Sequence, residues 1–196
     1  MMSETPGLVE ALKPVAKALQ SMDVRFYVGG SVASSYHGAS RSTLDVDLVA
    51  DLKRENVELL VEELQDEYYV SSSAIIDAIE RCSCFNLIHL SSSFKVDVFI
   101  FKNRDFDKAS MKRAKLGKVD SQSKFEVPIA SPEDTILSKL EWYRLGNEVS
   151  ERQWDDVVRV MKVLGDHANH EYLTRTAANL KVEDLLQKLF GLQSKK

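Results

Sequence analysis

The amino-acid sequence predicts an α/β fold of the mixed α+β kind, with a β-sheet flanked by helices and a C-terminal helical bundle. With 196 residues, 44% hydrophobic and 29% charged, the chain is long enough for one well-buried core. Short apolar runs alternate with amphipathic stretches until about residue 130, and from Ser131 onward only helical patterns occur. We therefore expect an α/β core over residues 1–130 and a helical region packed on it over residues 131–196.

The expected helices show apolar residues at helical spacing, and several have recognisable capping residues. Ser71 is a suitable N-cap. The stretch "SPEDTILSKLEWYRLG" begins with serine, proline and acids and ends at a glycine, a scheme that "SERQWDDVVRVMKVLG" repeats. In chain order, the expected helices are 7–20 with a kink at Pro14, a short helix from Ser31 to Gly38, 54–68, 71–82, 131–146, 150–165, and two shorter ones near 169–179 and 182–190.

The expected strands are short runs bounded by turn-forming residues and rich in β-branched and aromatic side chains. The runs "CFNLIHL" and "FKVDVFIF" are separated by "SSS", which is short enough for a hairpin. In chain order, the expected strands are 24–28, 44–50, 84–90, 94–101 and 124–130.

Composition and charge exclude several classes of protein. The formal net charge of −4 argues against non-specific nucleic-acid binding over the whole surface. No apolar run is long enough to span a bilayer, so no membrane partner is expected. The first residues are amphipathic and carry acids, unlike a signal peptide, so the expected location is cytoplasmic. Cys82 and Cys84 are too close along one strand for an unstrained disulfide and are expected to be reduced.

Three carboxylates interrupt runs that otherwise look suited to burial. Asp45 and Asp47 share one face of the expected strand 44–50, with Val46 facing the core. Asp97 interrupts "FKVDVFIF" in the same way. Neighbouring carboxylates repel each other and are costly to desolvate, a cost that Mg²⁺ removes. If the two strands are neighbours, the three aspartates converge on a site for two Mg²⁺ ions roughly 3.5–4 Å apart, a site also compatible with Mn²⁺.

A glycine-rich turn precedes these aspartates. Gly29 and Gly30 end an expected strand, and Ser31 begins a helix. Residues without a Cβ let backbone N–H groups approach a phosphate closely. The helix N-terminus and the Ser31 hydroxyl are therefore expected to hold the β- and γ-phosphates of a nucleoside triphosphate, and Arg41 is placed to pair with a phosphate oxygen.

The motif Gly-Gly-Ser, thirteen residues, Asp-x-Asp and a later lone strand aspartate resembles the nucleotidyltransferase superfamily of the DNA polymerase β type. In that family the Gly-Ser turn binds the triphosphate and three aspartates carry two Mg²⁺ ions. The resemblance covers roughly residues 24–101. It carries these roles to Gly30, Ser31, Asp45, Asp47 and Asp97, with Gly29 and Arg41 as weaker additions.

The segment "LSKLEWYRLGNEVSERQWDDVVRVM" is similar to the tail of small bacterial nucleotidyltransferase-like proteins, including the abortive-infection toxin type. Their pattern corresponds here to Lys139, Arg144, Arg152 and either Asp155 or Asp156. The likeness implies that Lys139 reaches the triphosphate and that an aspartate of the second helix fixes a basic side chain. The alternative is that these are ordinary surface charges, with the aspartates complementing a helix dipole.

Other conspicuous residues have plainer interpretations. His37 and His89 lie in apolar contexts typical of structural histidines. The basic stretch 107–118 is interpreted as a solvated face, with contact to an acidic acceptor such as RNA as its alternative. Trp142 and Trp154 are expected in the core, with stacking on a nucleobase as the alternative.

These patterns lead to the hypothesis of a Mg²⁺-dependent nucleotidyltransferase. It would move a nucleoside monophosphate from an NTP to an acceptor hydroxyl and release pyrophosphate, with Asp45, Asp47 and Asp97 as catalytic and metal-binding residues. RNA, a protein side chain and a small molecule are all compatible acceptors, and a homodimer is permitted. The alternative is a non-catalytic nucleotide-binding or toxin–antitoxin component on the same fold. A metal-dependent hydrolase is less consistent, because no histidine accompanies these aspartates.

Overall fold

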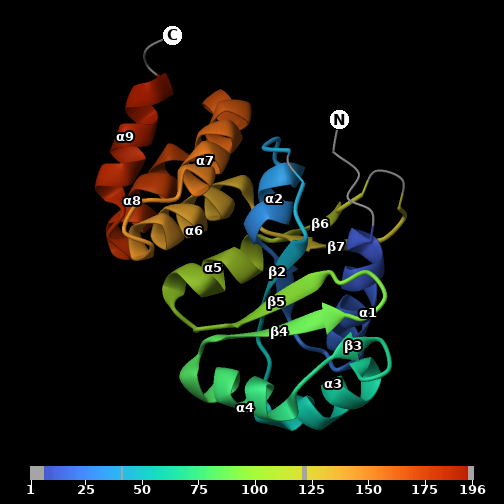
Figure 1. Ribbon diagram of the computed structural model, residues 1–196. Coiled ribbons are helices and arrows are strands. Elements are labelled where there is room, and N and C mark those ends of the chain that lie inside the picture. Colours follow the sequence, from blue (N-terminus) through green and yellow to red (C-terminus); the bar gives the residue numbers. More distant parts are fainter. Residues whose placement is uncertain (1–6, 41, 121–122, 194–196) are drawn as a thin grey trace.

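The computed structural model describes residues 7–40, 42–120 and 123–193 (Figure 1). The described residues form a mixed seven-stranded sheet in the order β3-β4-β5-β2-β1-β7-β6. β2 runs parallel to β5 and β1 runs parallel to β7, and the other neighbouring pairs are antiparallel. The strands are β1 (Phe26–Val28), β2 (Asp45–Ala50), β3 (Tyr68–Tyr69), β4 (Cys84–His89), β5 (Lys95–Ile100), β6 (Lys115–Lys118) and β7 (Glu126–Ile129).

Helices cover the sheet and continue beyond it as the predicted C-terminal bundle. The predicted serine caps are confirmed: the hydroxyls of Ser71, Ser131 and Ser150 each accept a backbone N–H from three residues further along. α1 continues through Pro14. The helices are α1 (Leu8–Ser21), α2 (Gly30–Tyr36), α3 (Val57–Leu64), α4 (Ser72–Arg81), α5 (Asp105–Arg113), α6 (Pro132–Leu145), α7 (Glu151–Leu164), α8 (His170–Leu180) and α9 (Glu183–Gln193), with short 3-10 turns at Arg54–Asn56 and Gly165–His167.

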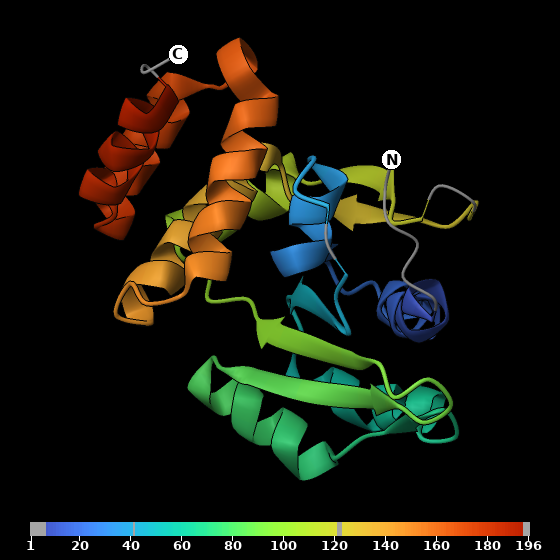
Figure 2. The ribbon, with the colours of Figure 1, turned by 45° about the horizontal axis from the view of Figure 1, so that its top comes forward.

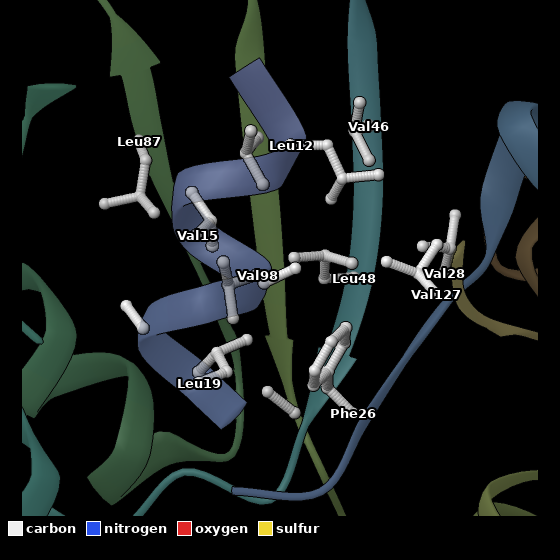
Figure 3. Close-up of a cluster of buried hydrophobic side chains, with 14 of the residues drawn as sticks. Leu12, Val15, Leu19, Phe26, Val28, Val46, Leu48, Leu87, Val98 and Val127 are labelled. Carbon is white, nitrogen blue, oxygen red and sulfur yellow. The ribbon is translucent and has the colours of Figure 1, made fainter. Parts of the chain in front are cut away.

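The first hydrophobic core lies between one face of the sheet and helices α1, α3 and α4 (Figure 3). Leu12, Val15 and Leu19 of α1 pack against alternate residues of the central strands, among them Leu48 and Val98. Because side chains alternate along a strand, burying one set on α1 leaves the other set of β2 and β5 on the opposite face. That opposite face carries the predicted carboxylates.

Helices α6 to α9 lie together beside the sheet domain (Figure 2), and the second core joins them. α6 and α7 both contact α2, the short helix that follows the glycine turn. Ile136, Leu137 and Leu140 of α6 are fully buried in this core. The packing fixes the bundle beside the start of α2, and so beside the uncovered face of β2.

Three elements differ from the sequence-based expectation. The expected helix 54–68 ends at Leu64, and Tyr68–Tyr69 joins β4 as the edge strand β3, where the Tyr68 hydroxyl donates to the Ala11 carbonyl at 2.6 Å. The stretch 107–118, for which no helix or strand was expected, contributes to α5 and β6. Its many lysines and arginines concealed the pattern, because only Phe106, Asp107 and Ser110 of α5 are buried.

Candidate active site

The three predicted carboxylates lie on one face of two neighbouring strands. Asp45 and Asp47 are half-buried on the face of β2 away from α1, and Val46 between them is completely buried. In the parallel pairing of β2 with β5, Asp47 stands directly opposite Asp97. The structure therefore brings together the three aspartates that the sequence predicted, by strand register and alternation.

The glycine turn packs against Asp47. The Gly29 N–H donates to the Asp47 carbonyl at 2.8 Å, and the Ser31 N–H donates to the Asp47 carboxylate. Gly30 has a φ of +53°, and a Cβ at this position would lie 1.6 Å from Asp47 Oδ2. Only glycine fits between the turn and the carboxylate. One N–H group that the sequence assigned to phosphate, that of Ser31, thus already holds Asp47.

Charge is concentrated around Asp47. Burial, with smaller contributions from Asp45 and Asp97, raises its pKa to about 6, against the opposing effects of Lys139 and the Ser31 N–H. Lys95 Nζ lies 2.8 Å from Asp97 Oδ2, and this contact raises the pKa of Lys95. The Thr43 hydroxyl donates to Asp45 Oδ1. Each carboxylate of the cluster therefore has a polar neighbour of its own.

The donor chemistry of this cluster suits a hard divalent cation. Three half-buried carboxylates on adjacent strands repel one another, and a bound cation would relieve that repulsion. As the side chains lie, residues 7–40, 42–120 and 123–193 contain no group of three or more Asp, Glu, His or Cys that could hold an ion. The Lys95 ammonium group is the neighbour that Asp97 would have to release first.

A cavity of about 440 Å³ opens beside the carboxylates, between the uncovered sheet face, α2, α6 and the start of α7. Gly29, Gly30, Ser31 and Asp47 line one part of it. Another part is lined by aromatic rings and by polar side chains of α6 and α7, namely Phe99, Lys139, Glu141, Trp142, Arg152 and Gln153. The cavity thus joins the predicted phosphate turn to aromatic side chains.

The expectation that Trp142 is a core residue is wrong. Its side chain is 44% exposed, lines the cavity, and lies with its ring centroid 5.5 Å from that of Phe99 at an interplanar angle of 60°. Trp154, in contrast, packs within the bundle beside Tyr143, as expected. The periodicity of α6 did not show that Trp142 is exposed, because a helix packed on several sides buries residues all round.

Lys139 is buried and lines the cavity. Its ammonium group lies 2.8 Å from Asp156 Oδ2, and both side chains are almost fully covered. The aspartate that fixes the basic side chain is therefore Asp156, whereas Asp155 is exposed. Arg144 pairs with Glu148 and Asp184, outside the cavity lining.

A second, more open cavity of about 540 Å³ lies at the beginning of β2 and β5. The residues that line it are Ser42, Thr43, Leu44, Asp45, Ser93, Lys95 and Arg152. The sequence-based reasoning did not select Thr43, Lys95 or Phe99, although Lys95 and Phe99 flank Asp97 at two-residue spacing and so share its face. Arg41 lies outside the described residues.

Comparison with known proteins identifies the fold. No family model matches the chain, and no curated protein matches it. The solution structure of the antibiotic-resistance factor ANT(2'')-Ia is similar, with a TM-score of 0.55 and 11% identity over 98% of this chain and 97% of that one. A crystal structure of ANT(2'')-Ia in complex with adenylyl-2''-tobramycin gives a TM-score of 0.52 and 13% identity over 88% and 96% of the two chains.

A third similar structure is an antigenic nucleotidyltransferase-like protein from Paracoccidioides brasiliensis. It has a TM-score of 0.53 and 17% identity over 94% of this chain and 93% of that one. At such low sequence identity, the structural similarity shows a shared fold and does not by itself show a shared activity. The chain has the nucleotidyltransferase fold, as its sequence predicted.

Proposed function

We propose that the protein is a Mg²⁺-dependent nucleotidyltransferase that transfers a nucleoside monophosphate from an NTP to an acceptor hydroxyl and releases pyrophosphate. The observation that carries the proposal is the position of the three aspartates. They face one side of β2 and β5, beside a cavity that begins at the Gly29–Ser31 turn. The fold shared with nucleotidyltransferases supports it.

Asp45, Asp47 and Asp97 would hold two Mg²⁺ ions, or Mn²⁺ in their place. When bound, the ions supply charge neutralisation on the triphosphate and acidify the acceptor hydroxyl. The protein fixes Asp47 through the Ser31 N–H and the absence of a Cβ at Gly30. Asp97 on β5 would accept the proton of the acceptor hydroxyl once the Lys95 ammonium group has moved away from it.

The remaining cavity residues would bind the nucleotide. The Ser31 hydroxyl and Lys139 would contact phosphate oxygens, and Asp156 holds Lys139 in place. Trp142 and Phe99 offer the nucleobase an aromatic surface, for which stacking is worth about 1–3 kcal/mol per base. Gly29 and Gly30 keep the backbone close to the phosphates.

The acceptor would be an RNA, protein or small-molecule hydroxyl. ANT(2'')-Ia, which shares this fold, has been solved with adenylyl-2''-tobramycin, a nucleotide joined to a small molecule. We therefore place small-molecule hydroxyls first among the acceptors to be tested. A toxin–antitoxin component that binds nucleotides without transferring them is the alternative outcome.

The test begins with calorimetry of ATP, GTP, CTP and UTP, with and without Mg²⁺. Each α-labelled NTP is then incubated with protein, Mg²⁺ and cell lysate separated into small-molecule, RNA and protein fractions. We expect Mg²⁺-dependent binding and labelling of one fraction, with labelling abolished in Asp45→Asn and Asp47→Asn proteins that still fold. Binding without labelling of any fraction favours the non-catalytic alternative, and full transfer by either variant refutes the proposed mechanism.

A further inference from the structure

Arg152 lies where the two cavities meet. Among the described residues it is the one side chain that lines both the 440 Å³ cavity and the open cavity at the beginning of β2 and β5. The first cavity contains Ser31 and Asp47, and the second contains Thr43 and Asp45. Arg152 therefore lies at the boundary between the two cavities, as Asp45 and Asp47 do.

The helix that carries Arg152 is firmly positioned at this point. Arg152 and Asp156 are four residues apart on α7 and so lie on the same helix face. Asp156 is joined to Lys139 of α6 through a buried ion pair of 2.8 Å, and Lys139 lines the first cavity. The ion pair sets the orientation of this face, and Arg152 is one turn nearer the carboxylates.

The location of Arg152 is unfavourable for the helix itself. Ser150 is the N-cap of α7, so Arg152 is in the first turn, where the helix dipole disfavours a cation. In the described part of the chain, no carboxylate lies within salt-bridge distance of Arg152, whereas Arg104, Arg113 and Arg144 each have such partners. A charge with neither helix nor ion-pair stabilisation, placed at a cavity, indicates a ligand of opposite charge.

We infer that Arg152 binds the β- and γ-phosphates of the nucleoside triphosphate; this inference rests on the proposed function. The nucleoside would lie beside Trp142, and the phosphate chain would run past Ser31 to the boundary of the two cavities, where Arg152 lies. A guanidinium group suits this task, because its planar fork donates two parallel hydrogen bonds to one phosphate. Arg152 is thus a binding residue for the phosphate chain and makes no contact with the nucleoside.

The test compares a triphosphate with its monophosphate, for example ATP with AMP, by calorimetry in Mg²⁺ on the parent, Arg152→Ala, Arg152→Lys and Arg159→Ala proteins. Arg159 is a matched control, because it is an exposed arginine of the same helix outside both cavity linings. We expect Arg152→Ala to weaken ATP binding roughly tenfold to a hundredfold and to change AMP binding less than twofold. Arg152→Lys should fall between, and Arg159→Ala should match the parent for both nucleotides.

The outcomes separate the inference from the proposed function. Parental ATP affinity in Arg152→Ala, or an equal loss for ATP and AMP, overturns the inference and leaves the proposed function standing. Failure of the parent protein to bind any NTP overturns both. If Arg152→Ala melts below the assay temperature, Arg152→Lys decides, since it keeps the charge and loses the fork: an unchanged ratio of ATP to AMP affinity then refutes the assignment.

Discussion

Replacing Gly30 with alanine tests whether the glycine turn exists to seat Asp47. The added Cβ would lie 1.6 Å from Asp47 Oδ2. Separating these atoms to a van der Waals distance of about 3.5 Å requires a displacement of roughly 2 Å. The carboxylate must then leave its place beside Asp45 and Asp97, or the start of α2 must move and take the Ser31 N–H with it. Either movement disrupts the site.

The magnitude follows from two separate effects. A non-glycine residue in the left-handed region costs about 1–2 kcal/mol, which lowers the melting temperature of a chain of this size by roughly 2–8 °C. Misplacing a reacting group by even 1 Å costs about 100-fold in rate. We therefore expect Gly30→Ala to fold, to melt slightly earlier, and to lose at least about 100-fold in Mg²⁺-dependent label transfer.

Gly165→Ala is the matched control for this experiment. Gly165 also has a φ of +53°, and a Cβ there would meet nothing within 4 Å. It lies at the end of α7, away from both cavity linings. Its alanine variant should lose stability but keep the transfer rate of the folded protein. Parental transfer by Gly30→Ala, or an equal loss in both variants, would refute the steric explanation.

Three further predictions concern the surroundings of the site. Lys95→Met frees Asp97 of its 2.8 Å contact and should strengthen Mn²⁺ binding several-fold in nucleotide-free calorimetry; weaker or unchanged binding contradicts the idea that Lys95 competes with the ion. Trp142→Ala should weaken ATP and AMP binding equally, by roughly tenfold, with an unchanged melting temperature because the ring is 44% exposed; retained affinity for both nucleotides would exclude stacking. Burial lowers the pKa of His37, so the folded state resists protonation while the unfolded state accepts a proton near pH 6.5. Stability should therefore fall as the pH drops from 7 through the folded-state pKa of His37. His37→Gln retains a donor for the Ala130 carbonyl and should flatten that part of the plot of melting temperature against pH. A slope like that of the parent protein would refute the role of His37 in this pH dependence.

Alternation along a strand explains why the sequence predicted the carboxylates so well. Val46 and Leu48 must be buried, so Asp45 and Asp47 have to face the other way whatever surrounds them. The partnership with Asp97 was conditional, because periodicity does not show which strands are neighbours or in which register. The pairing of Asp47 with Asp97 is supplied by tertiary structure.

The cavity residues of the helices were harder to predict, for a physical reason. A helix at the surface of a domain shows one apolar face, but α6 packs between α2, α7 and α8 and buries the charged side chains of Glu133, Asp134 and Lys139. Its pattern therefore does not indicate which residue borders a cavity. Trp142 could be recognised as a cavity residue only when α6 had been placed over β5, beside Phe99.

The balance of charge around the site gives Arg152 its significance. Three aspartates share one face of β2 and β5, Asp47 lines the first cavity and Asp45 the second, and a triphosphate would bring several further negative charges to them. Two nearby cations are already engaged, Lys139 with Asp156 and Lys95 with Asp97. Bound divalent ions would neutralise the carboxylates and part of the triphosphate, and the proposed phosphate chain would extend beyond that cluster. In the proposed function, a positive group at the boundary of the two cavities would balance the charge that remains, and Arg152 lies there without a carboxylate partner among the described residues.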